Sequence, residues 1–141
     1  MTEGFVVVPA AELRWEAIPG GLGAEMVVVL GRPEAEGELY VVRCRFPPWV
    51  MDRPHCHPHA RLVTVLEGEW LAGTGPVFAP FSSGRRLRPG DSMLHPAGAW
   101  HWDGSCGERP VVVQIAGLGP AATTLCDGSR PMWVSVRPAK L

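Results

Sequence analysis

The sequence predicts an all-β fold, a sandwich or a barrel made of short strands. Valine-rich apolar runs of strand length recur along the 141 residues, and 17 glycines and 15 prolines punctuate them. No stretch combines helical periodicity with capping residues at both ends. Hydrophobic residues make up 46% of the chain and charged residues 19%, so the chain can bury a core and is not a disordered polymer.

The expected elements follow one another along the chain. Residues 10–18 come nearest to a helix, with room for two turns before a proline and two glycines. Residues 73–86 predict a long loop or an irregular hairpin, and Gly90 and Asp91 open a strand. Neither a repeat nor a low-complexity linker divides the chain, so we expect one domain over residues 1–141. The other strands are expected at residues 5–8, 26–30, 39–46, 62–66, 111–115 and 132–136.

Charge and hydropathy exclude several classes of function. The formal net charge is −1, and basic residues cluster only at residues 85–88, which does not favour a nucleic-acid surface. No apolar run approaches the roughly 20 residues of a membrane span, and the N-terminus lacks the features of a signal peptide. We therefore expect a cytoplasmic protein that binds neither nucleic acid nor membrane. Free thiols are expected at the four cysteines, which form no C-x-x-C pair: Cys44, Cys56, Cys106 and Cys126.

The stretch "HCHPHAR" carries three histidines at every second position, His55, His57 and His59. In a strand they share one face, with neighbours about 6.5–7 Å apart and the outer two about 13 Å apart. Two of them reach one metal easily, whereas the third requires a bend, which Pro58 could supply. The alternative is three solvated histidines in a proline-rich loop.

A second pair of histidines favours the interpretation as a metal site. His95 precedes a Pro-Ala-Gly turn, and His101 follows it. A His-x-His pair on one strand and a lone histidine further along can bring three imidazoles together from neighbouring strands.

At these residues the chain resembles the cupin superfamily, whose members are jelly-roll β-barrels with two histidine motifs. In the first motif His55 and His57 match, and a glycine, Gly68, follows at the family's spacing. The matches to the second motif are Gly90, Pro96, Gly98 and His101. The resemblance implies a cupin-type jelly-roll β-barrel with its core at about residues 24–119, and a metal held by His55, His57 and His101.

Three positions depart from the family's pattern. Trp49 stands where the first motif begins with glycine, and Ser105 where the second ends with asparagine. Arg61 stands where the family has its glutamate ligand. A guanidinium stays protonated and offers no lone pair, so it cannot bind a metal. His59 could take the place of the carboxylate if Pro58 bends the strand; otherwise it is a surface residue or supports the site from outside.

Nitrogen ligands favour a divalent transition metal (Zn, Fe, Ni, Mn or Cu) over Mg²⁺ and Ca²⁺. Arg61 shares the parity of His55 and His57, so a regular strand would turn it inward beside the metal. Burying these charges together without an anion is costly, and we therefore expect an anionic ligand between them. The alternative is that Arg61 reaches the rim or pairs with Asp103 or Glu108.

Two more residues are candidates for substrate binding. His95 could line the cavity, or be a core histidine that donates to a carbonyl. Gln114 lies in an apolar strand and must find partners, either in the pocket or on the backbone.

The resemblance implies a metal-dependent oxidoreductase of dioxygenase type, or an isomerase, acting on a small anionic or carbonyl-containing molecule. A non-catalytic, metal-loaded ligand-binding or sensor module is the alternative, and a jelly roll that has lost its metal is a third reading. Whether the chain is an enzyme stays open. A homodimer is expected, because tryptophans on an outer face typically mark an interface; the candidates are Trp49, Trp70, Trp100, Trp102 and Trp133.

Overall fold

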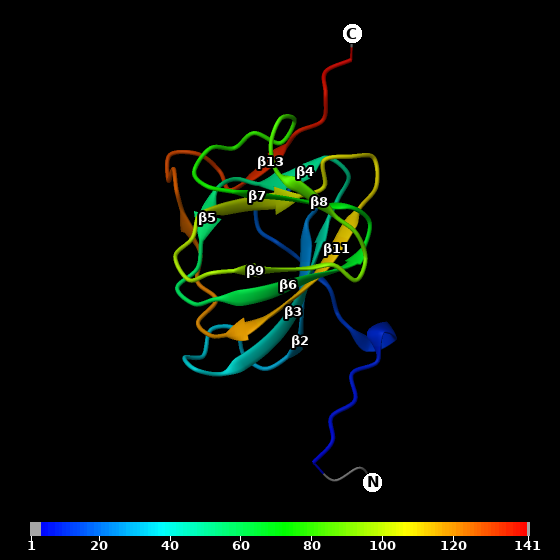
Figure 1. Ribbon diagram of the computed structural model, residues 1–141. Coiled ribbons are helices and arrows are strands. Elements are labelled where there is room, and N and C mark those ends of the chain that lie inside the picture. Colours follow the sequence, from blue (N-terminus) through cyan, green and yellow to red (C-terminus); the bar gives the residue numbers. More distant parts are fainter. Residues whose placement is uncertain (1–3, 141) are drawn as a thin grey trace.

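Two antiparallel sheets lie face to face in the computed structural model, which describes residues 4–140 (Figure 1). Sheet A has the strand order β1-β2-β3-β11-β6-β9, and sheet B the order β12-β5-β10-β4-β13, with β7 joining β10 to β8. The strands are β1 (Glu16–Ala17), β2 (Glu25–Leu30), β3 (Leu39–Phe46), β4 (Val50–Asp52), β5 (His55–Cys56), β6 (Arg61–Glu67), β7 (Trp70–Thr74), β8 (Arg85–Leu87), β9 (Ser92–His95), β10 (His101–Gly104), β11 (Val111–Leu118), β12 (Thr124–Leu125) and β13 (Trp133–Ser135).

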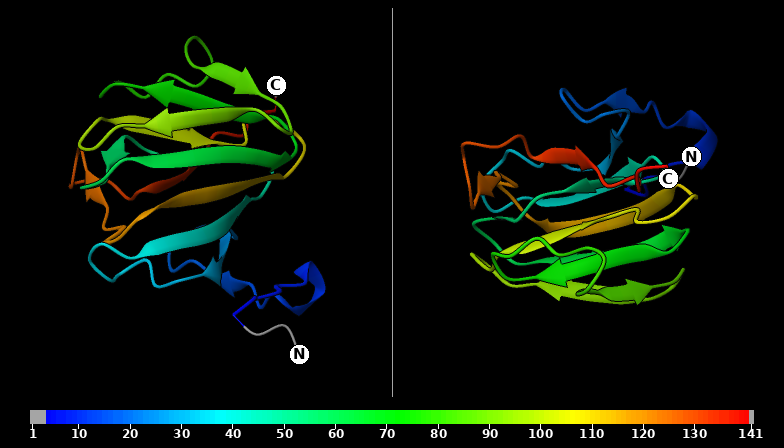
Figure 2. Two further views of the ribbon diagram at one scale, coloured as in Figure 1. Left: turned by 60° about the horizontal axis from the view of Figure 1, so that its bottom comes forward. Right: turned by 90° about the horizontal axis from the view of Figure 1, so that it is seen from above.

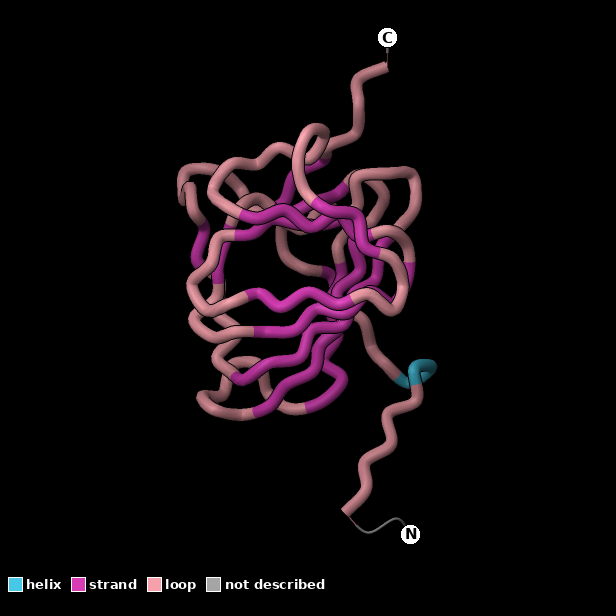
Figure 3. The backbone as a smooth tube through the Cα atoms, viewed as in Figure 1, coloured by secondary structure: helices cyan, strands magenta, loops and turns pink. Residues whose placement is uncertain are grey.

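The all-β jelly roll is therefore confirmed, with one refinement. The sheets pack as a sandwich and do not close into a continuous barrel (Figure 2). Within the described residues the only helix is a single 3-10 turn, η1 (Ala10–Glu12), on the segment that runs away from the sheets (Figure 3). No helix there has the length and apolar character needed to cross a bilayer.

Most of the expected strands are present. The run 39–46 coincides with β3, and the runs 26–30, 62–66 and 111–115 fall within β2, β6 and β11. Two expectations were wrong. Residues 5–8 are exposed coil, because no neighbouring strand pairs with them, and the two-turn helix at residues 10–18 gives way to η1 and β1, which pairs with β2.

The core lies between the sheets and follows from strand alternation. On β3, every second side chain, from Tyr40 to Phe46, is buried, and the residues between them are half-buried. On β11 the inward residues Val113 and Ile115 pack against the same cluster. Such alternation turns one face of each sheet toward the other sheet and so creates the space in which the site is built.

Two of the tryptophans that are candidates for a dimer interface belong to the core. Trp70 and Trp102 are both fully buried within the chain, so neither can form an interface. Trp102 packs against Met51 and Leu71, and Gly73 leaves room for its ring: a Cβ at Gly73 would lie 2.0 Å from it. The homodimer stays a prediction, and these two residues no longer support it.

The backbone conformation explains why glycine stands at three positions of the two motifs. Gly68, Gly90 and Gly98 all have positive φ, a conformation that side chains disfavour. Trp49, at the position of the family's first glycine, also has φ 63°. Trp49 therefore adopts a left-handed backbone conformation that glycine adopts more readily.

Candidate metal centre

Three histidines come together inside the jelly roll. His55 opens β5, His57 follows that strand, and His101 opens β10, where it pairs directly with His55. Ring nitrogens of the three residues all lie within 4.8 Å of one another. The ring centroids are 4.3 Å apart for His55 and His101 and 5.1 Å apart for the other two pairs. The two motifs thus meet because β5 and β10 are neighbours in sheet B.

Backbone carbonyls orient the three rings. The Nδ1 atoms of His55, His57 and His101 lie 2.7, 3.1 and 3.0 Å from the carbonyl oxygens of Arg53, Ala122 and Ala99. A carbonyl oxygen can only accept, so each Nδ1 donates its hydrogen and each Nε2 keeps a lone pair.

This tautomer is the one that a metal requires. The Nε2 atoms of His57 and His101 are buried and have no hydrogen-bond partner within residues 4–140. Buried polar atoms normally have partners, and a metal would supply one. A hydrogen bond from the other ring nitrogen to a carbonyl is the usual support of a metal-binding histidine. The residues present therefore fit a divalent transition metal.

Burial keeps these rings neutral. Loss of hydration, followed by the nearby His101, lowers the pKa of His55 to about 2. Burial and then the charge of Arg61 lower the pKa of His57 to about 3, and burial also lowers the pKa of His101. Neutral imidazole is the form that binds a metal, so the folded protein holds these ligands ready at neutral pH.

His95 lies beside the triad. It ends β9, is 2% exposed and stacks on the ring of His101 at a centroid distance of 3.7 Å. Both of its ring nitrogens are buried without a hydrogen-bond partner in the part of the chain that the structure describes. One expectation was that His95 is a core histidine that donates to a carbonyl, and the structure shows no such hydrogen bond among the described residues. Its nitrogens are available to a ligand.

Two other candidates lie elsewhere. His59 is exposed and does not join the group of His55, His57 and His101. The Oε1 atom of Gln114 accepts a hydrogen bond of 3.0 Å from Nε of Arg43. Gln114 alternates with the buried Val113 and Ile115, so its side chain lies on the outer face of sheet A, away from the histidines.

Arg61 points inward. It opens β6 and lines the same cavity as His55 and His57. Its Nε atom is buried and has no hydrogen-bond partner among the described residues. No ion pair within residues 4–140 joins Arg61 to Asp103 or Glu108. The guanidinium is thus held beside the triad with donor capacity to spare.

Two buried carboxyl groups, which the sequence reasoning did not assign to the site, also line this cavity. Asp52 ends β4 and Asp103 lies within β10. The backbone N–H of Asp103 donates to Oδ1 of Asp52 at 2.8 Å, and Nε1–H of Trp70 donates to Asp103 at 2.9 Å. Burial, and next the neighbouring Asp103, raise the pKa of Asp52 well above its usual value. Asp103 lies two residues after His101 on the same strand, so strand alternation could have predicted that it faces the site.

The cavity is small and has two kinds of wall. Its volume is about 170 Å³. The polar wall consists of His55, His57, Arg61, Asp52 and Asp103, and the remaining wall is largely apolar, with Tyr40, Val42, Cys44, Phe46, Ile115 and Trp133 among its residues. A ligand that fits both walls has a polar head and a compact apolar body.

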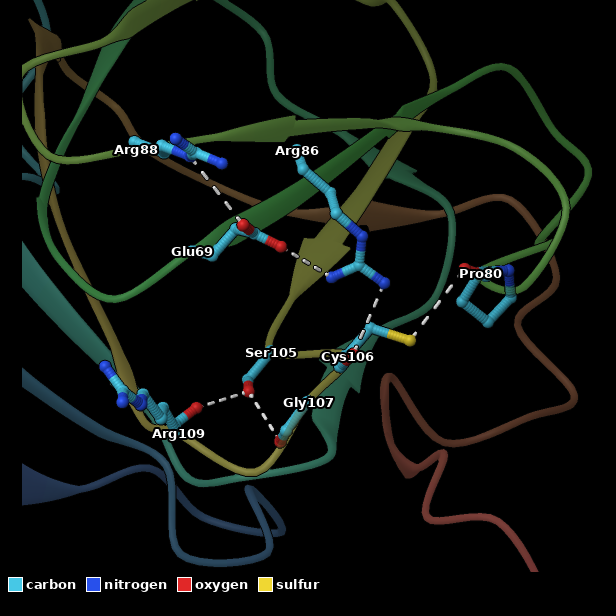
Figure 4. A network of polar contacts seen from close by, with 8 residues as sticks. All are labelled: Glu69, Pro80, Arg86, Arg88, Ser105, Cys106, Gly107 and Arg109. Carbon is cyan, nitrogen blue, oxygen red and sulfur yellow. Dashed lines mark hydrogen bonds and ion pairs between the residues drawn. The ribbon is translucent and has the colours of Figure 1, made fainter.

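A wider cleft of about 500 Å³ lies at the far ends of β6 and β10. Glu69 lies between Arg86 and Arg88 there, with N–O distances of 3.0 and 3.9 Å (Figure 4). These side chains are exposed, and such ion pairs contribute little. The cleft contains no histidine, and we therefore assign the chemistry to the smaller cavity.

Ser105 belongs to this far end of the molecule. Its hydroxyl donates to the carbonyl oxygen of Arg109 at 2.7 Å and so closes the loop before β11 (Figure 4). The serine that replaces the family's asparagine thus has a structural role in this loop.

Comparison with known proteins supports the same fold. No family model matches the chain. The germin-like protein subfamily 1 member 7 of Arabidopsis thaliana is 35% identical over 100 residues, which are 64% of this chain and 43% of that protein. The chain therefore spans less than half the length of this curated relative.

Solved structures resemble the chain as well. An RmlC-like cupin from Shewanella frigidimarina NCIMB 400 has a TM-score of 0.62 at 22% identity, covering 85% of this chain and 93% of that one. The DMSP lyase DddQ from Ruegeria pomeroyi DSS-3 has a TM-score of 0.64 at 22% identity, with 82% and 61% covered. An oxalate oxidase in complex with the substrate analogue glycolate has a TM-score of 0.52 at 22% identity, with 62% and 45% covered. The two-sheet jelly roll and these similarities together show that the chain has the jelly-roll fold of the cupin structures.

Proposed function

We propose that the chain is a metal-dependent cupin that binds a small anionic or carbonyl-containing molecule beside its metal. His55, His57 and His101 would hold a divalent transition metal, which is Zn, Fe, Ni, Mn or Cu. The observation that carries the proposal is the shared orientation of the three rings, each donating Nδ1–H to a backbone carbonyl. His59, which is exposed, is left out of this ligand set.

Charge in the cavity supports an anionic ligand. A divalent metal and Arg61 bring three positive charges into a buried space. Asp52 and Asp103 offset at most two of them, and fewer because the raised pKa of Asp52 favours its neutral form. A positive charge is left over, and burying it without an anion is costly. An anion held between the metal and the guanidinium would neutralise it.

The chemistry that fits this arrangement is oxidoreductase chemistry of dioxygenase type. When bound, a transition metal supplies Lewis acidity or a site for dioxygen. In this chain Arg61 would bind and orient the ligand, His95 would face it with a free ring nitrogen, and the apolar wall would exclude water. By their names, the DMSP lyase and the oxalate oxidase are enzymes that act on small molecules.

We also propose a domain organisation, an assembly and a location for the chain. One domain covers residues 1–141 with its core at about residues 24–119, and the protein works as a cytoplasmic homodimer. Gln114, which lies with Arg43 on the outer face, is not proposed as a ligand contact.

The test replaces Arg61 with glutamine in the metal-loaded protein. Loss of a charged hydrogen bond, worth about 1.5–3 kcal/mol, should weaken binding of glycolate by roughly tenfold to a hundredfold, whereas metal content should stay unchanged because Arg61 is not a ligand. Isothermal titration measures the first quantity and elemental analysis the second. The matched control is Arg43→Gln, on the outer face. Equal glycolate affinity in wild type and Arg61→Gln would contradict the anion site.

Catalysis needs a separate measurement. Oxygen uptake by the iron-loaded protein with diketones, flavonols and thiols separates an enzyme from a ligand-binding or sensor module. Turnover that disappears in His101→Ala supports the oxidoreductase. Ligand binding without turnover across the panel favours the sensor module.

A further inference from the structure

A row of functional side chains crosses the inner face of sheet A at the level of Arg61. Gly117 of β11 pairs with Tyr40 on one side and with Arg61 on the other, and Arg61 pairs in turn with His95. Paired residues in an antiparallel sheet point to the same side. Tyr40 and His95 are each 2% exposed, so the row faces the interior. A phenol, a gap, a guanidinium and an imidazole therefore follow one another across four strands.

Gly117 is the gap in this row. A Cβ atom at this position would lie 3.0 Å from the hydroxyl oxygen of Tyr40 and 3.2 Å from Cβ of Arg61. Its φ lies outside the left-handed range, so the backbone itself does not require glycine here. The missing side chain leaves space between the Tyr40 hydroxyl and Cβ of Arg61.

We propose that the Tyr40 hydroxyl and the Arg61 guanidinium together bind the carboxylate group of a small monocarboxylate. This inference rests on the anion site proposed above. Both residues line the cavity that contains His55 and His57. Nε of Arg61 is buried without a hydrogen-bond partner within residues 4–140, so it has a donor to offer. A phenolic O–H and a guanidinium N–H that line one cavity can each donate to one oxygen of a carboxylate.

The apolar wall defines the rest of the ligand. Inward side chains of the same sheet follow Tyr40 along β3, namely Val42 and Phe46, and Ile115 lies opposite Val42 on β11. Trp133 completes this wall from β13. A carboxylate head held by Tyr40 and Arg61 would leave its carbon chain against these residues. The cavity volume of about 170 Å³ leaves room for only a short carbon chain in the ligand. The ligand class is thus a short-chain aliphatic monocarboxylate, not a sugar or a nucleotide.

The test compares butyrate with butyramide, which has the same shape and no charge. Zinc-loaded wild type should bind butyrate more tightly than butyramide in isothermal titration. Tyr40→Phe removes one donor to a charged group, so butyrate affinity should fall roughly tenfold or more while butyramide affinity changes little. Gly117→Ala should weaken the binding of butyrate by a similar factor, because the new methyl group displaces the Tyr40 hydroxyl. Zinc content and the far-ultraviolet circular dichroism spectrum should stay those of wild type.

Matched controls separate this inference from the proposed function. Gly128→Ala adds a methyl group with no neighbour within 4 Å, and it should leave butyrate binding unchanged. If Arg61→Gln weakens butyrate binding but Tyr40→Phe and Gly117→Ala do not, the role of Tyr40 is overturned and the anion site stands. Equal losses for butyrate and butyramide in Tyr40→Phe would also overturn it, since the hydroxyl would then serve packing. If zinc-loaded wild type binds no carboxylate, both proposals are wrong.

Discussion

At the scale of single residues, four buried histidines make the metal-free protein sensitive to acid. Burial is the largest cause that lowers the pKa of His55 and His95 to about 2 and that of His57 to about 3, and it also lowers the pKa of His101. The unfolded chain takes up these protons near pH 6.5, whereas the folded chain does not. The free energy of unfolding should therefore fall as the pH drops below about 6.5, by up to about 1.4 kcal/mol per pH unit for each histidine.

Urea unfolding of the chelator-treated protein at pH 7.5 and pH 5.5 measures this dependence. We expect a lower midpoint at pH 5.5. Asp52 acts in the opposite direction, because its raised pKa favours the folded state as the pH falls, but it is one group against four. His95→Gln should reduce the difference between the two pH values, since one titrating group is lost. An unchanged midpoint would show that the histidines are not held neutral.

The sequence predicted the triad but not what holds it in place. Strand alternation put His55 and His57 on one face, and the family motif supplied His101. The carbonyl that accepts from His57 belongs to Ala122, 65 positions further along the chain, and no local pattern signals such a partner. The same applies to Asp52, which reaches Asp103 only because β4 and β10 are neighbours.

At the scale of elements, the turn after β6 depends on Gly68. Its φ is +78°, and a Cβ there would lie 2.3 Å from the carbonyl oxygen of Pro110. Gly68→Ala should lower the free energy of unfolding by more than the roughly 1–2 kcal/mol that a left-handed alanine costs, because the clash adds to it. Gly90→Ala is the matched control: its φ is +95°, but no atom lies within 4 Å of the added Cβ. Thermal unfolding of both variants measures the difference, and equal losses would contradict the role of the close contact.

Long valine-rich strands were predictable, and short polar ones were not. β3 and β6 bury alternate residues, and β11 buries its first three residues and then Ile115, so apolar side chains mark all three strands. β5 and β12 have two residues each and exist because they pair with each other, while β5 also pairs with β10. Residues 5–8 show the converse: a strand-like composition without a neighbour to pair with forms no strand.

At the scale of the whole molecule, the site requires both sheets. Sheet B supplies His55 and His101 through β5 and β10, while sheet A supplies Tyr40, Arg61 and His95. A resemblance in two motifs was enough to predict the jelly roll, but it did not predict that the sheets stay open as a sandwich. Since ligands from separate strands meet only after folding, binding of a metal should be linked to stability.

Elemental analysis of the purified, metal-reconstituted protein tests the central claim most directly. The account predicts one divalent transition metal ion per chain in the wild type. It predicts a large loss of metal in each of His55→Ala, His57→Ala and His101→Ala, and full metal content in His59→Ala, whose side chain is exposed. Circular dichroism confirms that each variant is folded. A wild type that stays metal-free, or folded triad variants that keep their metal, would contradict the account.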